Sequence, residues 1–168
     1  MIGLCATLIA RFFGAIIGSI AAVVRKSFSE AIMRVMDIVM AVPGIAMAAV
    51  SVLVFGRTLS KSGNTFGLVV VIICSIAFVY IPQLSRIVRA NVMAAYGEDY
   101  VRAVIVSGAR APWILTKHVM RNTAAPVLVF ATVLVADAII LEASLTFIGS
   151  GLPATTVATW GNVLSAAS

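Results

Sequence analysis

Charged residues are scarce in this chain. Only 11% of its 168 residues are Asp, Glu, Lys or Arg, whereas 62% are hydrophobic. A soluble domain carries about a quarter charged residues, and one small core has no room for the apolar surface behind a mean hydropathy of +1.14. The composition therefore excludes an ordinary soluble domain and predicts an integral membrane protein.

Residues that bind metals or perform catalysis are also scarce. The chain has one histidine, His118, and two cysteines, Cys5 and Cys74, which form no Cys-x-x-Cys motif and no Cys/His cluster. A lone histidine without a neighbouring ligand does not make a metal site, for nickel or any other ion. The sequence also lacks a P-loop, a catalytic triad and paired carboxylates. We therefore expect no metal site, no catalytic residues, no enzymatic activity and no cofactor bound by this chain.

Four apolar runs are long enough to cross a bilayer, for which a helix needs about 20 mainly apolar residues. They cover residues 2–24, 35–55, 66–85 and 124–148. None alternates polar with apolar residues as barrel strands do, so the predicted fold class is all-α. Pro43 with Gly44, and Pro82 in the last turn of the third span, predict bends. Such bends suit either a path that opens and closes or static packing, and both interpretations stay open.

Basic residues mark the orientation of these spans. The first connection is flanked by Arg25, Lys26 and Arg34, and the third contains Arg86, Arg89, Arg102, Arg110, Lys117 and Arg121. The second connection has only Arg57 and Lys61, and the tail at 149–168 has no charge. The positive-inside rule then places the first and third connections in the cytoplasm and the others outside. Topology therefore accounts for the net charge of +6, and we expect no nucleic-acid partner.

The third connection, residues 96–122, is far longer than a turn requires. Between Glu98 and Ser107 an apolar helical face is formed by Val101, Val104 and Ile105, and the polar residues Asp99, Arg102 and Ser107 point elsewhere, as in an amphipathic helix. Gly108 permits a sharp turn, and Pro112 suits the first turn of a second helix. Three residues offer apolar anchors: Trp113, Ile114 and Val119. The pattern predicts two short helices that either dock in a partner's groove or lie on the lipid surface.

Several motifs in order resemble the inner-membrane permease subunits of ABC importers, specifically the C-type permeases of the dipeptide, oligopeptide and nickel group. The loop is similar to the EAA loop of that superfamily, with Ala103 at its first alanine and Gly108 at its glycine. Tyr100-Val101 and His118-Val119, with Asn122, match the peptide-permease version. The other matching segments are residues 33–37, 41–44, 86–89, 142–149 and 160–162. The loop departs from the pattern at Arg102, Val104 and Arg121, where the family has glutamate, alanine and proline.

The resemblance implies the core of a type I ABC importer as one domain, residues 1–168, in the bacterial inner membrane. In that family two cytoplasmic ATPase subunits, which hold ATP and magnesium, dock on the loop at 96–122. A second permease completes the path through the lipid, and a substrate-binding protein outside meets the segment at 149–168. The coupling residues carried over are Asp99, Tyr100, Arg102, Ala103, Gly108, Ala109, Trp113 and His118. The family also has a first and a last transmembrane helix, which we expect this chain to lack, and its substrates include dipeptides, oligopeptides, glutathione and nickel chelates.

Three charged residues lie within apolar spans: Arg11, Asp137 and Glu142. Intramembrane charges tend to pair or to face water. We expect Arg11 and Asp137 either to form a buried ion pair or to line the path separately, and Glu142 to be a solvated carboxylate or to face the path. The three together leave open a self-contained channel or ion-coupled carrier, and a non-functional truncated permease is a further alternative.

Small residues recur every fourth position along the first span. They are Ala10, Gly14, Gly18 and Ala22. Such a stripe lets two helix backbones approach closely, although it also suits a narrow place in a pore. Both interpretations remain open at this point.

Overall fold

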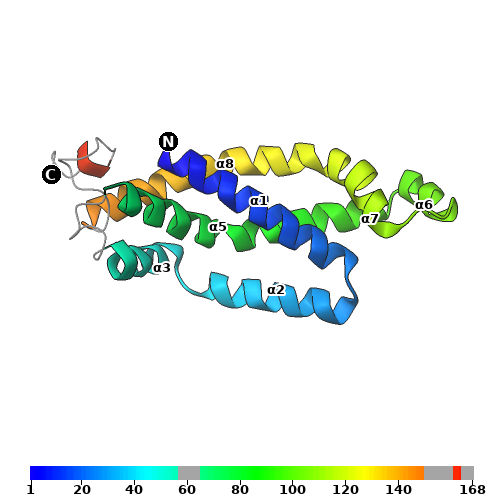
Figure 1. Cartoon of the computed structure of the whole chain (residues 1–168), viewed down its shortest axis with the longest axis horizontal. Helices are drawn as coiled ribbons and strands as arrows, with labels where there is room; N and C mark the ends of the chain where they lie inside the picture. The colour runs from blue at the N-terminus through cyan, green and yellow to red at the C-terminus, as the bar shows by residue number, and fades with distance from the viewer. Residues whose placement is uncertain (57–64, 150–160, 164–168) are drawn as a thin grey trace.

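The computed structural model describes residues 1–56, 65–149 and 161–163, and the regular elements within them are helical (Figure 1). This confirms the all-α fold class. Three helices in this part of the chain are long and apolar enough to cross a membrane, or four if one bent pair counts as a single span. In order the elements are α1 (Ile2–Val23), α2 (Lys26–Ala41), α3 (Gly44–Ser51), η1 (Val52–Gly56), α5 (Thr65–Tyr96), α6 (Asp99–Val106), α7 (Ala111–Ile114), η2 (Leu115–Val119) and α8 (Met120–Phe147).

Helices α1, α5 and α8 form the centre of the bundle (Figure 1). The small residues of α1 face α5, where Ala10, Gly14 and Gly18 are buried. A Cβ atom on Gly18 would lie 2.5 Å from the Ser85 carbonyl oxygen, and one on Gly14 would lie 2.7 Å from Leu84 Cβ. The stripe therefore serves close helix packing, and the alternative of a narrow place in a pore is not what these residues form here.

The second predicted span differs from the expectation of one span at 35–55. Its helical region begins at Lys26 with α2 and breaks before Gly44, where α3 begins. The two parts meet at an angle of 81°, because proline and the extended residue before it cannot continue a helix. Pro43 and Gly44 therefore bend this segment as predicted, but the bend is sharp enough to make two separate helices.

The third predicted span is also longer than expected. Helix α5 continues to Tyr96 as one element of 32 residues, so Pro82 lies in its interior rather than in its last turn. At about 1.5 Å per residue α5 is roughly 48 Å long, which exceeds the hydrocarbon thickness of about 30 Å. The last turns of α5, with Arg86 and Arg89, therefore extend beyond the apolar part of the helix.

The connections alternate between the two ends of the bundle (Figure 1). At one end lie the α1–α2 connection and the segment that joins α5 to α8, and we name this the basic end. At the other end lie the start of α1, α3, the start of α5 and the end of α8, and we name this the outer end. This arrangement matches the predicted alternation, and the positive-inside rule assigns the basic end to the cytoplasm.

Candidate functional site

The segment between α5 and α8 projects from the basic end of the bundle, and we name residues 97–119 the connector (Figure 1). It begins with α6 and turns at Gly108, whose φ of +82° lies in the left-handed region. The Gly108 N–H donates to the Ile105 carbonyl at 2.9 Å. Glycine adopts this conformation without the steric cost that a side chain brings, so the predicted turn at Gly108 is confirmed.

After the turn the chain does not form a second separate helix. Pro112 lies in the first turn of α7, as predicted, but helical structure then continues from Ala111 through η2 and α8 to Phe147. The expectation of two short helices within 96–122 is therefore wrong for the second one, which is the beginning of the last long helix. Helix α7 is thus continuous with α8.

Buried side chains fix the connector to the bundle. Val101 in α6 is 0% exposed, and Ile114 and Val119 are also fully buried in the common core. The Tyr96 hydroxyl donates to the Ala111 carbonyl at 3.3 Å and ties the end of α5 to the start of α7. The prediction that Ile114 and Val119 anchor a partner is therefore wrong, because both side chains pack inside this chain and are not available to a partner.

Other apolar side chains of the connector face outward, and we name this set the apolar patch. Val106 is 88% exposed and Trp113 is 45% exposed. Ile105 and Tyr100 also leave more than a third of their surface uncovered. Sequence reasoning placed Ile105 on the same face as Val101 and did not select Val106. In α6 Val101 is buried and Val104 is half-buried, whereas Ile105 and Val106 are exposed. The rotation of α6 against the bundle decides this, and no signal in the sequence predicts it.

Trp113 lies within a small cluster of its own. The Lys117 Nζ atom lies 5.4 Å from the centre of the Trp113 ring, within the range of a cation–π contact. The ring of His118 lies 5.0 Å from the Trp113 ring. Within the described part of the chain, His118 Nε2 is buried and has no hydrogen-bond partner. Lys117 and His118 therefore lie beside the partly exposed indole of Trp113.

The remaining coupling residues carried over from the resemblance also lie in the connector. Asp99, Arg102, Ala103 and Gly108 are exposed, and Ala109 is half-buried. The Ala109 N–H donates to the Val104 carbonyl at 3.4 Å, which closes the turn after α6. The structure therefore places the predicted coupling residues on the same projection from the bundle (Figure 1).

A polar contact that sequence reasoning missed joins α2 to α5. Arg86 Nη2 donates to Asp37 Oδ1 and forms an ion pair with it. Arg89 Nε donates to Ser29 Oγ at 2.9 Å. Asp37 and Arg86 belong to two of the motifs on which the resemblance rests, and their opposite charges were the signal. These contacts hold α2 against α5 on the basic side of the bend at Pro43.

The three mid-span charges do not come together. Among the described residues Arg11 and Asp137 form no ion pair with each other, so the predicted buried pair is wrong within this chain. Glu142 is 8% exposed and lies 3.4 Å from Thr146 Oγ1, which donates to it. The interpretation of Glu142 as a solvated carboxylate is therefore wrong as well. Asp137 is exposed and Arg11 is half-buried.

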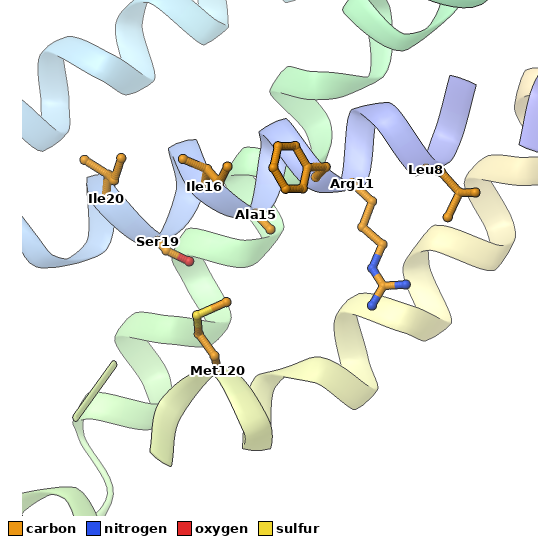
Figure 2. Close-up of a pocket in the computed structure, with 8 residues that line it drawn as sticks. Leu8, Arg11, Ala15, Ile16, Ser19, Ile20 and Met120 are labelled. Carbon is orange, nitrogen blue, oxygen red and sulfur yellow. The ribbon is translucent and has the colours of Figure 1, made fainter. Parts of the chain in front are cut away.

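Arg11 projects into a groove between α1 and the first half of α8 (Figure 2). The groove has a volume of about 540 Å³ and is lined along α1 from Leu8 to Ile20, with Met120 of α8 on its other side. Figure 2 shows the guanidinium reaching from α1 toward the ribbon of α8. Apart from Arg11 and Ser19 the lining side chains are apolar.

The predicted external segment is described only at residues 161–163, and the aromatic residue Trp160 lies outside the described residues. This short piece packs on the outer end of α8. A Cβ atom on Gly161 would lie 2.6 Å from the Ala143 carbonyl oxygen and would also meet Thr146 Cβ. Gly161 therefore allows the backbone to approach α8 beside the buried Glu142.

Comparison with known proteins supplies a separate line of support. Residues 14–167 match the family described as binding-protein-dependent transport system inner membrane component. The chain is 38% identical, over 98% of its own length and 51% of the relative's, to a Brucella suis protein named as a permease of a peptide transport system. It is 33% identical to the oligopeptide transport system permease protein OppC of Bacillus subtilis, over 98% of this chain and 50% of that one. It is also 33% identical to the di/tripeptide transport system permease protein DppC of Pseudomonas aeruginosa, over 99% of this chain and 52% of that one.

These matches confirm the resemblance that the sequence motifs predicted. The chain spans about half the length of the curated relatives that it matches. Its described part has the apolar helices that a multi-pass inner-membrane protein requires. This chain therefore belongs to the family of binding-protein-dependent transport system inner membrane components, which are membrane permeases and not enzymes.

Proposed function

We propose that this chain forms half of the translocation path of an ATP-driven importer for peptides or a related small solute. A second permease subunit forms the other half. Two cytoplasmic ATPase subunits, which bind ATP and magnesium, dock on the connector, and an extracytoplasmic binding protein delivers the solute at the outer end. The curated relatives are named as permeases of peptide transport, which supports peptides as the class of solute.

The apolar patch of the connector is the observation that carries this proposal. Val106 and Trp113 are exposed at the end of the bundle that the basic residues assign to the cytoplasm. An exposed aromatic residue with aliphatic neighbours, on a base fixed by buried residues, is typical of a surface where a partner protein binds. Because α7 is continuous with α8, a partner that moves the connector also moves a transmembrane helix. This continuity gives ATP hydrolysis on the partner a mechanical route into the membrane.

A self-contained carrier that uses Arg11, Asp137 and Glu142 as a charge relay has less support. A relay needs neighbouring groups that exchange protons or ions. Within the described residues Arg11 and Asp137 make no ion pair, and Glu142 bonds to Thr146 of its own helix. We therefore assign no relay to these residues.

Co-purification of a nucleotide-binding subunit tests the proposal. The tagged full chain is expressed in its native host and purified from membranes, and the product is labelled with a photoreactive ATP analogue. We expect a labelled cytoplasmic subunit with the wild-type chain, and its loss by about tenfold or more with Trp113→Ala, because a docked aromatic residue contributes about 2 kcal/mol or more. Phe66→Ala is the matched control, since Phe66 is also an exposed aromatic residue but lies at the outer end of α5.

The alternatives give different results in the same experiment. Transport of a labelled peptide by the purified chain without any ATP-labelled subunit would favour a self-contained carrier. Full retention of the labelled subunit by Trp113→Ala would show that Trp113 is not an anchor. Absence of both the labelled subunit and transport would favour a non-functional truncated permease.

A further inference from the structure

The rings of Trp113 and His118 contact each other although the two residues are not neighbours on one face of a regular helix. Their ring centres lie 5.0 Å apart, with an angle of 58° between the ring planes. Successive residues of an α-helix are about 100° apart around the axis, so the fifth residue after Trp113 would point about 140° away from it. The contact therefore requires a helical turn that is wider than an α-turn.

The wider turn is supplied by η2, which is a π-helix at Leu115–Val119. The Met120 N–H donates to the carbonyl of Leu115, five residues earlier, whereas an α-helical N–H binds the carbonyl four residues earlier. At the start of this turn Thr116 Oγ1 donates to the Pro112 carbonyl at 3.0 Å. Single π-helical turns are rare and occur frequently at functional sites. The backbone of η2 thus brings the indole and the imidazole together.

Hydrogen bonding at Nε2 does not explain the position of the His118 ring. This nitrogen is buried and has no hydrogen-bond partner among the described residues, and a buried polar atom without a partner costs stability. An atom that this chain itself covers is also out of reach of a partner subunit. The indole of Trp113, by contrast, is 45% exposed. The contact that remains for the buried side of the imidazole is the one with the indole.

We propose that His118 is a positioning residue for Trp113. Its ring, which η2 brings against the indole, restricts Trp113 to the orientation in which the ATPase subunit binds it. This inference rests on the proposed function, in which Trp113 anchors that subunit. A side chain that is restricted before binding loses less conformational entropy when the partner binds. His118 therefore contributes to binding through Trp113 and not through a separate contact of its own.

A double-mutant cycle tests whether His118 acts through Trp113. Co-purification of the ATP-labelled subunit, relative to the amount of inserted chain, is measured for His118→Ala, for Trp113→Ala and for the double variant. We expect His118→Ala to lower co-purification about fivefold, because the freed indole must be ordered on binding. In the Trp113→Ala background the same change is expected to have an effect of less than about twofold. Losses that multiply in the double variant would show a role in folding or in a separate contact and overturn the proposal.

Replacement of the imidazole by another ring is the conservative arm. His118→Phe keeps an aromatic ring beside the indole and removes Nε2, which has no partner among the described residues. We expect this variant to co-purify the labelled subunit to within about twofold of wild type, since aromatic rings pack edge to face on an indole. Phe66→Ala, at the outer end of α5, is again the control and is expected to have no effect. A Phe variant that binds no better than the Ala variant overturns the ring contact as the cause.

Fluorescence of Trp113 separates this inference from the proposed function, because it needs no partner subunit. The chain has two tryptophans, so Trp160→Phe leaves Trp113 as the only emitter, and time-resolved anisotropy of the purified full chain then measures how freely its indole moves. We expect the amplitude of the fast local motion to rise about twofold with His118→Ala and to stay unchanged with His118→Phe.

The two measurements together give distinct outcomes. An indole that moves equally in wild type and in His118→Ala overturns the inference, even if an ATP-labelled subunit binds. An indole that His118 restricts in a chain that binds no ATP-labelled subunit contradicts the proposed function, and the positioning of Trp113 by His118 then stands without it.

Discussion

Replacement of Gly18 by alanine is the sharpest test of how α1 packs on α5. The added Cβ atom would lie 2.5 Å from the Ser85 carbonyl oxygen and 2.8 Å from Val88 Cβ. Comfortable contacts between carbon atoms are about 3.5–4.0 Å, and a backbone carbonyl cannot rotate away as a side chain can. Helix α1 must therefore shift away from α5 by an appreciable part of an ångström along their shared length.

The expected magnitude follows from two opposing effects. Overpacking a tight contact costs about 1–3 kcal/mol, whereas alanine favours a helix over glycine by up to about 1 kcal/mol. We expect Gly18→Ala to lower the free energy of unfolding by about 1 kcal/mol or more. Without the close approach of α1 to α5 the substitution would be neutral or stabilising. The sign of the change in the free energy of unfolding therefore shows whether the two helices pack this closely.

Two other glycines of α1 supply matched comparisons. Gly14→Ala meets Leu84 Cβ at 2.7 Å but its nearest backbone atom only at 3.3 Å, and Gly3→Ala meets the movable Ile139 Cγ1 at 3.1 Å. We expect the loss of stability to rank Gly18 above Gly14 above Gly3. Unfolding of the purified variants by added SDS in mixed micelles, followed by circular dichroism, measures the ranking. Equal stability of Gly18→Ala and Gly3→Ala would refute the close packing of α1 on α5.

Three further predictions concern the connector, the α2–α5 contact and the topology. Gly108→Pro is expected to abolish transport while membrane insertion persists, because proline fixes φ near −65° and removes the N–H that binds the Ile105 carbonyl. Peptide uptake measures transport and membrane abundance measures insertion; full uptake would contradict this prediction. Arg86→Asp is expected to lower transport, and the added change Asp37→Arg to restore it, since the swapped charges recreate the ion pair; a double variant no better than the single one would show that the pair has no role. In a background without native cysteines, a cysteine at Ser27 is expected to react with an impermeant reagent only after cell lysis, and one at Ser62, which lies outside the described residues, in intact cells; the reverse pattern would invert the topology.

Hydropathy and charge along the chain were sufficient to predict the membrane class, the all-α fold and the alternation of connections. These properties depend on composition and on distances along the sequence, because a span needs about 20 apolar residues wherever its neighbours lie. The turn at Gly108 and the bend at Pro43 were predictable for a similar reason, since both follow from the conformational preferences of a single residue. The sequence motifs were also sufficient to identify the family.

Only the tertiary structure decided which side each residue faces. Ile114 and Val119 are as apolar as Val106, yet they are buried while Val106 is 88% exposed, because burial depends on the rotation of each helix about its axis relative to its neighbours. The same rotation explains why Asp37 contacts Arg86 across two helices, while Arg11 and Asp137 form no ion pair among the described residues. Depth follows from the number of residues along a helix, but contact between helices follows from their packing, which no single segment of the sequence specifies.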